Sequence, residues 1–219
     1  IQVIGPSVER LRALQDFWFR GMRKLGYQGK GIPSELVDDA YEMWCSVEPT
    51  PSYPIARPIA ARSDLQLSDV YVPDKSPTNG SSISFILSTA TSRALFLGDA
   101  WAEDIVEALT PLQTTSAPLL FDAIKVSHHG SLHNTSVELL SLIDSPCFFI
   151  SSDGSHHGHP DFEVLAEIVD RPSSFERKLF FNYSTTASKR LQEHTSRSGA
   201  RFSVHITDQD WIQVGVSDS

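Results

Sequence analysis

The chain has 219 residues, enough for one domain with a sizeable core or for two small domains. Hydrophobic residues make up 40% of it and charged residues 21%, proportions that exclude wholesale disorder. No run of about eighteen apolar residues occurs, so the sequence predicts no membrane-spanning helix. The formal charge of −9 argues against indiscriminate binding of nucleic acid over the whole surface.

The charge is distributed unevenly along the chain. Residues 1–31 hold six Lys and Arg against two acidic residues, a net of +4, so the remainder carries −13. A basic end on an acidic body can grip a phosphate-rich ligand, or it can be the solvated side of a helix. The two cysteines, Cys45 and Cys147, are too few for a disulfide framework and fit a reducing, cytoplasmic setting, with Cys147 buried as a small apolar residue.

The first third of the chain begins with a regular pattern and then loses it. Residues 1–4 are predicted to form a strand, and Ser7 follows as the N-cap of a helix with apolar residues at helical spacing. From 26 to 78 seven prolines interrupt the pattern, with one short helix predicted at 35–44. So long a stretch with little regular structure indicates an insertion that carries function, or a mobile segment.

From residue 82 onward, strand-like and helix-like segments alternate. The expected strands lie at 83–88, 94–97, 121–126, 147–151, 178–183, 201–207 and 211–216, and the expected helices at 101–109, 135–143, 161–169 and 187–194. Thr135 and Glu138 have the spacing of a capping box. The alternation indicates a layered α/β domain, and the hairpins at 83–97 and 201–216 indicate a mixed sheet.

Histidines gather where two of these strands end. Six of the eight lie between residues 128 and 159. His128 and His129 follow one expected strand, the run 156–159 follows the next, and Asp99 follows a third strand in the same way. Sites of α/β folds lie where strands end at one edge of a sheet. Imidazole and carboxylate together suit Zn²⁺, Mn²⁺ or Fe, so the pattern predicts a metal site.

Each of these residues also has a simpler interpretation. A Gly-Asp pair after a strand, as at Asp99, is more often an Asx turn than a metal ligand. One member of each histidine pair is expected to support a ligand or to lie on the surface. The histidines expected to lie in loops, on the surface or at helix ends are His156, His157, His133, His194 and His205.

Four short motifs follow one another along the chain. They are Asn79-Gly80-Ser81-Ser82-Ile83, Leu95-Phe96-Leu97-Gly98-Asp99-Ala100, Asp122-Ala123-Ile124-Lys125-Val126-Ser127-His128-His129-Gly130-Ser131 and Gly158-His159-Pro160. In this order they resemble the second half of a metallo-β-lactamase-fold hydrolase. The nearest resemblance is to the hydrolase domain of the bacterial competence DNA-uptake channel and to phosphodiesterases such as choline-phosphate esterases. With the opening Val3-Ile4-Gly5-Pro6, the resemblance covers about residues 1–15 and 78–216.

The resemblance implies both a fold and a reaction. The fold is α/β, the second half of a metallo-β-lactamase αβ/βα sandwich, with a mixed sheet and flanking helices in one domain, 1–219. The reaction is metal-dependent hydrolysis by a phosphodiesterase or nuclease, in which two divalent metal ions, Zn²⁺ or Mn²⁺, activate a water molecule. The relatives and the basic segment at 10–30 favour DNA, RNA or a cyclic or modified nucleotide as substrate.

Carried onto this sequence, the resemblance makes Asp99 the carboxylate that bridges or ligates the metal pair. His128 or His129 would be a further ligand, and His129 is favoured because the second histidine of the pair is the ligand in the phosphodiesterase relatives. His159 would line the site as a ligand or as a contact to the leaving group, and His159 or His128 would protonate the leaving oxygen. Residues with supporting roles would be Lys125, Ser131 and Ser82, the last as an anchor of the hairpin.

One departure from the family is large. The His-x-His-x-Asp-His or His-x-Asp-x-Asp-His motif, which supplies most metal ligands from the first half of the fold, is absent, and residues 1–98 contain no histidine. We therefore expect the first half to lie upstream or on another chain. The insertion 21–76 is expected to cover the mouth of the site or to meet a partner protein, with Trp44, Arg57 and Arg62 as candidate contacts.

Two alternatives remain open from the sequence. The chain could be a non-catalytic interaction domain that keeps the fold but lacks a complete metal site. The histidine run at 156–159 could also collect metal adventitiously.

Overall fold

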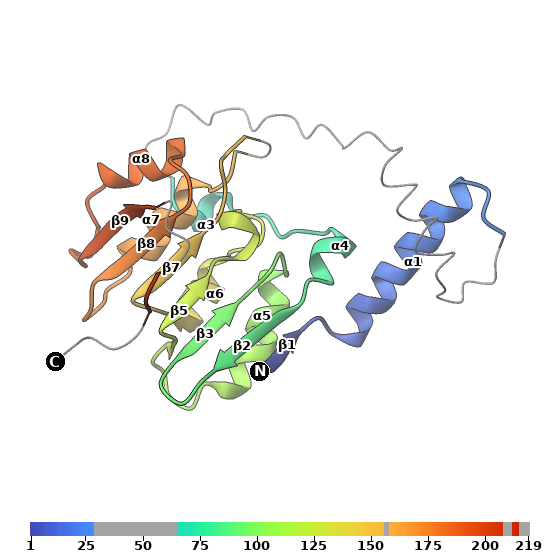
Figure 1. Cartoon of the computed structure of the whole chain (residues 1–219), viewed down its shortest axis with the longest axis horizontal. Helices are drawn as coiled ribbons and strands as arrows, with labels where there is room; N and C mark the ends of the chain where they lie inside the picture. Colours follow the sequence, from blue (N-terminus) through green and yellow to red (C-terminus); the bar gives the residue numbers. More distant parts are fainter. Residues whose placement is uncertain (29–64, 156–157, 208–211, 215–219) are drawn as a thin grey trace.

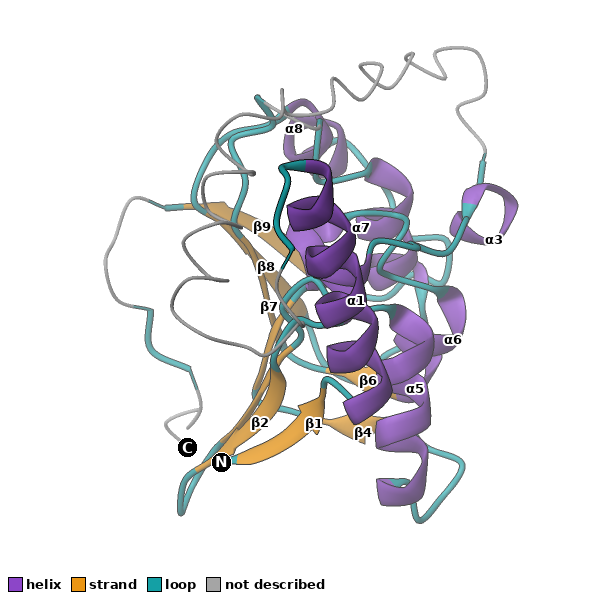
Figure 2. Ribbon diagram, turned by 90° about the vertical axis from the view of Figure 1, so that its right-hand side faces the viewer, coloured by secondary structure: helices purple, strands orange, loops and turns teal. Residues whose placement is uncertain are grey.

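A mixed sheet of seven strands forms the centre of the molecule, with helices on one of its faces (Figures 1 and 2). The structure is a computed structural model that describes residues 1–28, 65–155, 158–207 and 212–214. The strands, in spatial order, are β1 (Gln2–Gly5), β2 (Ser84–Ser88), β3 (Arg93–Phe96), β5 (Ala123–Lys125), β7 (Cys147–Ile150), β8 (Arg177–Phe181) and β9 (Phe202–Ile206). A separate two-stranded sheet pairs β4 (Leu119–Leu120) with β6 (Ile143–Asp144) in parallel.

The large sheet is antiparallel at one end and parallel elsewhere. β1, β2 and β3 pair antiparallel, and β3, β5, β7, β8 and β9 pair in parallel. The predicted mixed sheet is therefore confirmed, although only the first hairpin produces its antiparallel part. The second predicted hairpin is wrong in its described residues, because 212–214 are not in a strand. Ile212 and Gln213 instead line a shallow pocket with residues of β8 and β9, among them Phe180 and His205.

Helices occupy most of the connections between successive strands of the large sheet. They are α1 (Val8–Lys24), α3 (Leu67–Val70), α4 (Pro77–Gly80), α5 (Ala102–Leu109), α6 (Val137–Leu142), α7 (Phe162–Asp170) and α8 (Thr186–Gln192), with 3-10 turns at Thr110–Leu112 and Ser127–Gly130. The sequence did not predict α3 or α4, because four residues are too few for a helical period. The helix predicted at 35–44, like Cys45, Trp44, Arg57 and Arg62, lies outside the described residues.

Side-chain caps fix where two of the helices begin. Ser7 caps α1 as predicted, because its hydroxyl accepts a hydrogen bond from the amide of Arg10 at 3.3 Å. The capping box predicted at Thr135 and Glu138 is wrong. Ser136 has the extended backbone of an N-cap and accepts from the amide of Leu139 at 3.0 Å, while the Thr135 hydroxyl is buried. The helix therefore begins one residue later than a cap at Thr135 would place it.

The core lies between the sheet and helices α5 to α8. One transverse row of side chains on this face joins neighbours in register, and each is at most 1% exposed: Leu95, Ile124, Phe148 and Leu179. Aromatic and branched residues of this kind favour strands because they pack against cross-strand neighbours. The buried thiol of Cys147 matches its predicted role as a small apolar residue, and burial raises its pKa.

The opposite face of the sheet carries a second transverse row, which we call the aromatic row. Its members, in register from β2 to β9, are Phe85, Phe96, Lys125, Phe149, Phe180 and His205. Neighbouring rings stack with centroids 4.8 Å apart for Phe85 and Phe96 and 5.1 Å for Phe149 and Phe180. Figure 2 shows α5, α6 and α7 on the other side of the sheet. Apolar side chains on both faces are typical of a sheet with a layer on each side.

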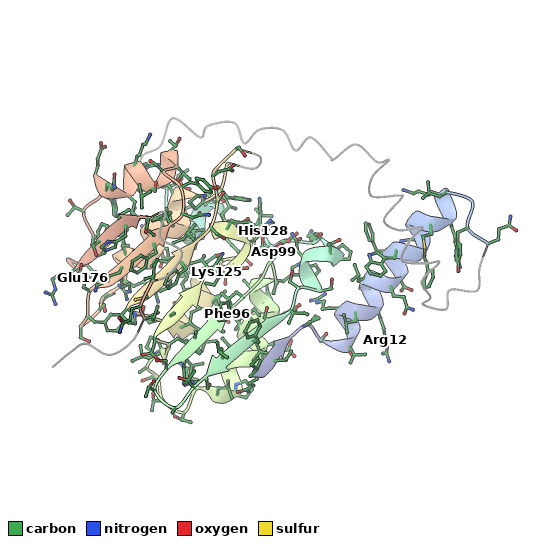
Figure 3. All side chains as sticks on the ribbon, viewed as in Figure 1. Arg12, Phe96, Asp99, Lys125, His128 and Glu176 are labelled. Atoms are coloured by element: carbon green, nitrogen blue, oxygen red, sulfur yellow. The ribbon has the colours of Figure 1, made fainter. Side chains whose placement is uncertain are left out.

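The long helix α1 extends beyond the edge of the sheet (Figure 1). Arg10 joins it to α5, because the guanidinium pairs with Asp104 at 2.6 Å and lies 3.9 Å from the centroid of the Trp101 ring. Arg10 is thus used in packing, while Arg12 lies on the extending part of α1, apart from Asp99 and His128 (Figure 3). Among the described helices, none is both long and apolar enough to cross a membrane.

Candidate functional site

Three neighbouring strand ends bring the predicted site residues to one edge of the sheet. β3, β5 and β7 are adjacent and parallel, and Asp99, the pair His128-His129 and His159 follow them in turn. The ring of His128 lies 5.3 Å from that of His159 and 6.1 Å from that of His129, centroid to centroid. The loop of Asp99 meets that of His128, because the amide of His128 donates to the carbonyl of Gly98 at 2.9 Å, and both residues are labelled at this edge in Figure 3. The predicted convergence of these residues at one sheet edge is therefore confirmed.

The backbone that carries the histidine pair is unusual. His128 and His129 have φ of 41° and 58°, in the left-handed region that residues other than glycine rarely adopt. The strand-end loops hold this conformation, since the amide of His128 donates to the carbonyl of Gly98 at 2.9 Å. Gly130 follows with φ of 86°, and a Cβ placed there would lie 2.8 Å from Cβ of Pro160. Consecutive left-handed residues of this kind cluster at functional sites.

Two of the histidines hold their proton on a defined ring nitrogen. Nδ1 of His129 makes a short hydrogen bond with the main-chain oxygen of Ser151, and Nδ1 of His159 lies 3.2 Å from Oδ2 of Asp161. A carbonyl oxygen or a carboxylate can only accept, so Nδ1 must donate in both rings. In each neutral ring the lone pair is therefore on Nε2. This is the tautomer in which metal-ligating histidines are usually held.

His128 bonds to a residue that the motifs did not single out. Its Nδ1 lies 2.7 Å from Oδ1 of Asn134, whose side chain is fully buried. The amide nitrogen of Asn134 contacts the main-chain oxygen of Asp99 at 2.9 Å and a carboxylate oxygen of Asp74 at 3.0 Å. Sequence reasoning missed both Asn134 and Asp74. The only signal was that Asn134 follows the His-His-Gly-Ser motif closely, and Asp74 sits in the proline-rich stretch assigned to the insertion.

The Asp74 carboxylate is held by several donors from its own segment. It accepts from the amide of Ser76 at 2.8 Å and from the side-chain nitrogen of Asn79 at 2.7 Å, in addition to Asn134. Burial by itself raises the pKa of Asp74, but these hydrogen bonds together outweigh it and leave the pKa lowered. The carboxylate is therefore ionised at neutral pH.

Lys125 brings a cation to the same edge. It ends β5, and its ammonium donates to the main-chain oxygen of Val126 at 3.2 Å. Burial lowers the pKa of Lys125, and the negative charge of Asp99 works in the opposite direction. Lys125 also belongs to the transverse row defined above as the aromatic row. There its neighbours in register are Phe96 and Phe149.

The remaining predicted residues take supporting or unrelated positions. Ser131 is buried and accepts from the amide of His133 at 3.2 Å. The hairpin is anchored by Ser84 rather than Ser82, because the Ser84 hydroxyl is the buried one and donates to Leu97 O at 2.7 Å.

The other histidines lie away from this edge or outside the described residues. His194 pairs with Asp170 at the end of α8, and His205 stacks on Phe180 in the aromatic row. His133 is exposed, as expected, with Nδ1 2.7 Å from the carbonyl of Val72. His156 and His157 are not among the described residues.

The donor set suits a divalent metal ion, but it is not a complete ligand sphere. Within the described part of the chain, no group of three or more His, Cys, Asp or Glu side chains is arranged to hold one ion. The carboxylate of Asp99 and imidazole nitrogens whose partners are fixed are nevertheless the ligand types that Zn²⁺ and Mn²⁺ accept. The residues present therefore fit part of such a site.

Comparison with known proteins adds no relative. A scan against protein-family models, a search of curated proteins and a search of solved structures each find no match to this chain. The mixed α/β sheet with flanking helices is the part of the predicted fold that the structure shows. The resemblance to metallo-β-lactamase-fold hydrolases, and the sandwich that it implies, stay predictions from the four motifs.

Proposed function

We propose that this chain is the part of a metal-dependent hydrolase that carries Asp99 and the histidine cluster, and that the enzyme cleaves phosphodiesters as a phosphodiesterase or nuclease. One observation carries the proposal. The rings of His128, His129 and His159 lie together, and Nδ1 of each is bonded to an oxygen atom of another residue. Histidines oriented in this way ligate metals or accept protons through Nε2.

The residues that would hold the metal are those of the motifs. Asp99 and a member of the His128-His129 pair, with His129 favoured, would contribute ligands for two divalent ions, Zn²⁺ or Mn²⁺. His159 would be either a further ligand or a contact to the leaving group. Such ions lower the pKa of bound water to about 7 and neutralise negative charge on a phosphoryl group. Further ligands would come from the first half of the fold, since the described residues supply only part of the set.

His159 has the partner that a general acid needs. Its Nδ1 faces Oδ2 of Asp161, which also accepts from the amide of Leu132 at 2.8 Å and is thereby held in place. The carboxylate beside Nδ1 orients the ring, and Nε2 is then the atom through which His159 would pass a proton to a leaving oxygen. The ammonium of Lys125 adds a positive charge at the same edge and favours an anionic substrate.

The aromatic row supports the presence of a second layer. The stacked rings of the aromatic row present apolar surface across one face of the sheet. A second layer that packs on this face, about 10 Å from the sheet, would bury that surface. We place the first half of the predicted sandwich on this face. That half would also bring its ligand motif toward the edge where Asp99 and the histidines lie.

A second candidate function is a non-catalytic interaction domain. It is favoured by the incomplete ligand set in the described residues and by the same aromatic face, which a partner protein would cover. Under this alternative the chain keeps the fold, binds no metal and hydrolyses nothing.

Hydrolysis of bis(p-nitrophenyl) phosphate and of single- and double-stranded DNA, with Zn²⁺ or Mn²⁺ added, tests the proposal. We expect turnover by the intact chain supplied with its first half, and loss of at least about 100-fold in Asp99→Ala. His133→Ala is the matched control, because it removes an exposed imidazole outside both the cluster and the aromatic row, and it should retain activity. Equal activity in Asp99→Ala and the intact chain would contradict the proposal.

The histidine run at 156–159 needs its own control. If this loop only collects metal adventitiously, replacing His156 and His157 together strips the metal. The hydrolase proposal expects little change in that double variant.

A further inference from the structure

We propose that Asn134 is a positioning residue for the site, and that Asp74 in turn orients the Asn134 side chain. Asn134 would fix both the tautomer of His128 and the separation of the His128 and Asp99 loops. The inference rests on the proposed function, because it assigns a role toward the same metal and substrate. Neither Asn134 nor Asp74 belongs to a ligand motif of the sequence.

The first step concerns the orientation of the Asn134 amide. One end of the side chain contacts the main-chain oxygen of Asp99 at 2.9 Å and Oδ2 of Asp74 at 3.0 Å. A carbonyl oxygen never donates, so this end must be the NH₂ group. The opposite end, facing His128, is therefore the amide oxygen. The orientation follows from the partners and needs no assumption about hydrogen positions.

The second step concerns the His128 ring. An amide oxygen only accepts, so the 2.7 Å contact with Nδ1 of His128 requires the proton to be on Nδ1. In the neutral ring Nε2 then carries the lone pair. Among the described residues none hydrogen-bonds Nε2 of His128, so that nitrogen is the one offered to an ion or a proton. A free imidazole in water has no such constraint.

The third step concerns burial. Asn134 is 0% exposed, so water cannot replace any of its three partners, which are His128, Asp74 and the main-chain oxygen of Asp99. Asp74 is held from its own segment by Ser76 and Asn79, and its amide donates to the carbonyl of His133 at 3.0 Å. Through these bonds the segment before β2 orients the side-chain amide of Asn134, and that amide orients the ring of His128.

The fourth step concerns the distance between two strand-end loops. Asn134 bonds both the backbone of Asp99, after β3, and the ring of His128, after β5. The buried hydroxyl of Ser127 also connects the two loops, because it donates to the carbonyl of Ala100 at 3.2 Å. The predicted ligands from two different strands are thus tied together by one buried side chain.

The test is a long-range proton–nitrogen correlation spectrum of the histidine rings in the metal-free chain, at about pH 8, where imidazole is neutral. The His128 signals are assigned by their absence in His128→Gln. We expect a proton on Nδ1 of His128 in the wild type. In Asn134→Ala we expect that ring to become a mixture of tautomers and the Zn²⁺ affinity, measured by competition with a chelating dye, to fall about 10- to 100-fold.

Gln113→Ala is the matched control, since it removes a side-chain amide that donates to the carbonyl of Ala117 at 2.9 Å and does not bond His128, Asn134 or Asp74. It should leave the tautomer unchanged. A wild-type His128 ring protonated on Nε2 would overturn the proposal without any variant, so a poorly folding Asn134→Ala does not leave it untested. An unchanged tautomer and affinity in folded Asn134→Ala would overturn it as well, even if the wild type hydrolyses phosphodiesters. A wild type with the expected tautomer and no hydrolysis would instead contradict the proposed function.

Discussion

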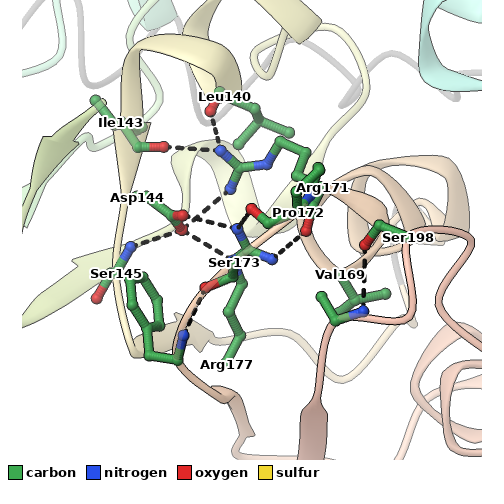
Figure 4. A network of polar contacts seen from close by, with 12 residues as sticks. Leu140, Ile143, Asp144, Ser145, Val169, Arg171, Pro172, Ser173, Arg177 and Ser198 are labelled. Atoms are coloured by element: carbon green, nitrogen blue, oxygen red, sulfur yellow. Dashed lines mark hydrogen bonds and ion pairs between the residues drawn. The ribbon is translucent and has the colours of Figure 1, made fainter. Parts of the chain in front are cut away.

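The two edges of the sheet each carry a polar cluster, and the clusters are built in opposite ways. At the edge where the parallel strands begin, Asp144 accepts two bonds from Arg177, at 2.9 and 2.7 Å, and lies 3.4 Å from Arg171 (Figure 4). Arg177 is 1% exposed and also donates to the main-chain oxygens of Arg171 and Pro172. At the edge where the strands end, His128, His129 and His159 each use Nδ1 for a bond within the protein.

The difference separates structure from function. In the Asp144 cluster two arginines pair with one carboxylate inside the chain, and the charge of Arg171 is retained because burial lowers its pKa only to about 10. The pairing is not complete, since Nε of Arg171 is buried with no hydrogen-bond partner among the described residues. In the histidine cluster, no described residue bonds Nε2 of His128 or His129. A cluster whose charges pair with one another holds the fold together, while a cluster that fixes one ring nitrogen and leaves the other available is prepared for a ligand.

The largest expected effect is on the Asp144 cluster. Arg177→Met leaves the Asp144 carboxylate buried with one partner fewer, so we expect a loss of about 3–5 kcal/mol in the free energy of unfolding. Urea denaturation followed by circular dichroism measures it. Arg201→Met, at an exposed arginine, is the control and should change stability by less than about 0.5 kcal/mol. A similar loss in both variants would contradict the assignment of the Asp144 cluster as a structural one.

The next effect is at the strained turn of the histidine cluster. Gly130→Ala introduces a Cβ 2.8 Å from Cβ of Pro160 at φ of 86°, and we expect it to cost about 2–4 kcal/mol. Gly199→Ala has a similar φ of 74° with nothing within 4 Å, so it should cost only about 1 kcal/mol. The difference between the two melting curves isolates the contact with Pro160, and equal costs would show that no such contact exists.

Asp74 should contribute to the loss of folding stability at acid pH. Its pKa is lowered in the folded chain, so its contribution to stability is present above the ordinary carboxyl pKa and is lost as the pH falls through the lowered value. Asp74→Asn should therefore flatten the acid limb of a stability-against-pH curve below about pH 4. An unchanged acid limb would mean that the folded and unfolded pKa values of Asp74 are equal.

The smallest effect is at Lys125. Because burial lowers its pKa, the ammonium form is disfavoured in the folded chain, and stability rises with pH between the lowered value and the ordinary value of about 10.4. Lys125→Met should raise stability at pH 7 by less than about 1 kcal/mol and abolish that rise. Thermal melts at about pH 7 and pH 10 test this, and a destabilised variant would contradict it.

The fold was predictable where the sequence pattern was local. Ser7, the alternation of strands and helices, and the placement of Asp99, His128 and His159 at strand ends all follow from spacing and caps. The failures were at positions that only tertiary contacts decide. Residues 212–214 have strand-like composition but are not in a strand, and Ser136 is the cap in place of Thr135 because the Thr135 hydroxyl is buried.

The candidate site was predictable only in its motif residues. Asn134 and Asp74 are 60 residues apart, and no local sequence pattern around either residue predicts their hydrogen bond. The register that lines up the aromatic row was likewise invisible before strand pairing was known. Residues that orient ligand side chains can come from any part of the sequence that the fold brings close to the site. Sequence spacing alone therefore does not identify them.

The most direct test of the central claim is the metal content of the purified chain, measured by mass spectrometry after exposure to saturating Zn²⁺ and Mn²⁺. Because the described residues supply only part of the ligand set, the account predicts at least one bound ion per intact chain and two once the first half of the fold is supplied. Asp99→Ala should lose at least one ion, with His133→Ala unchanged as the control. A metal-free intact chain would contradict the hydrolase account for this chain and favour the interaction domain.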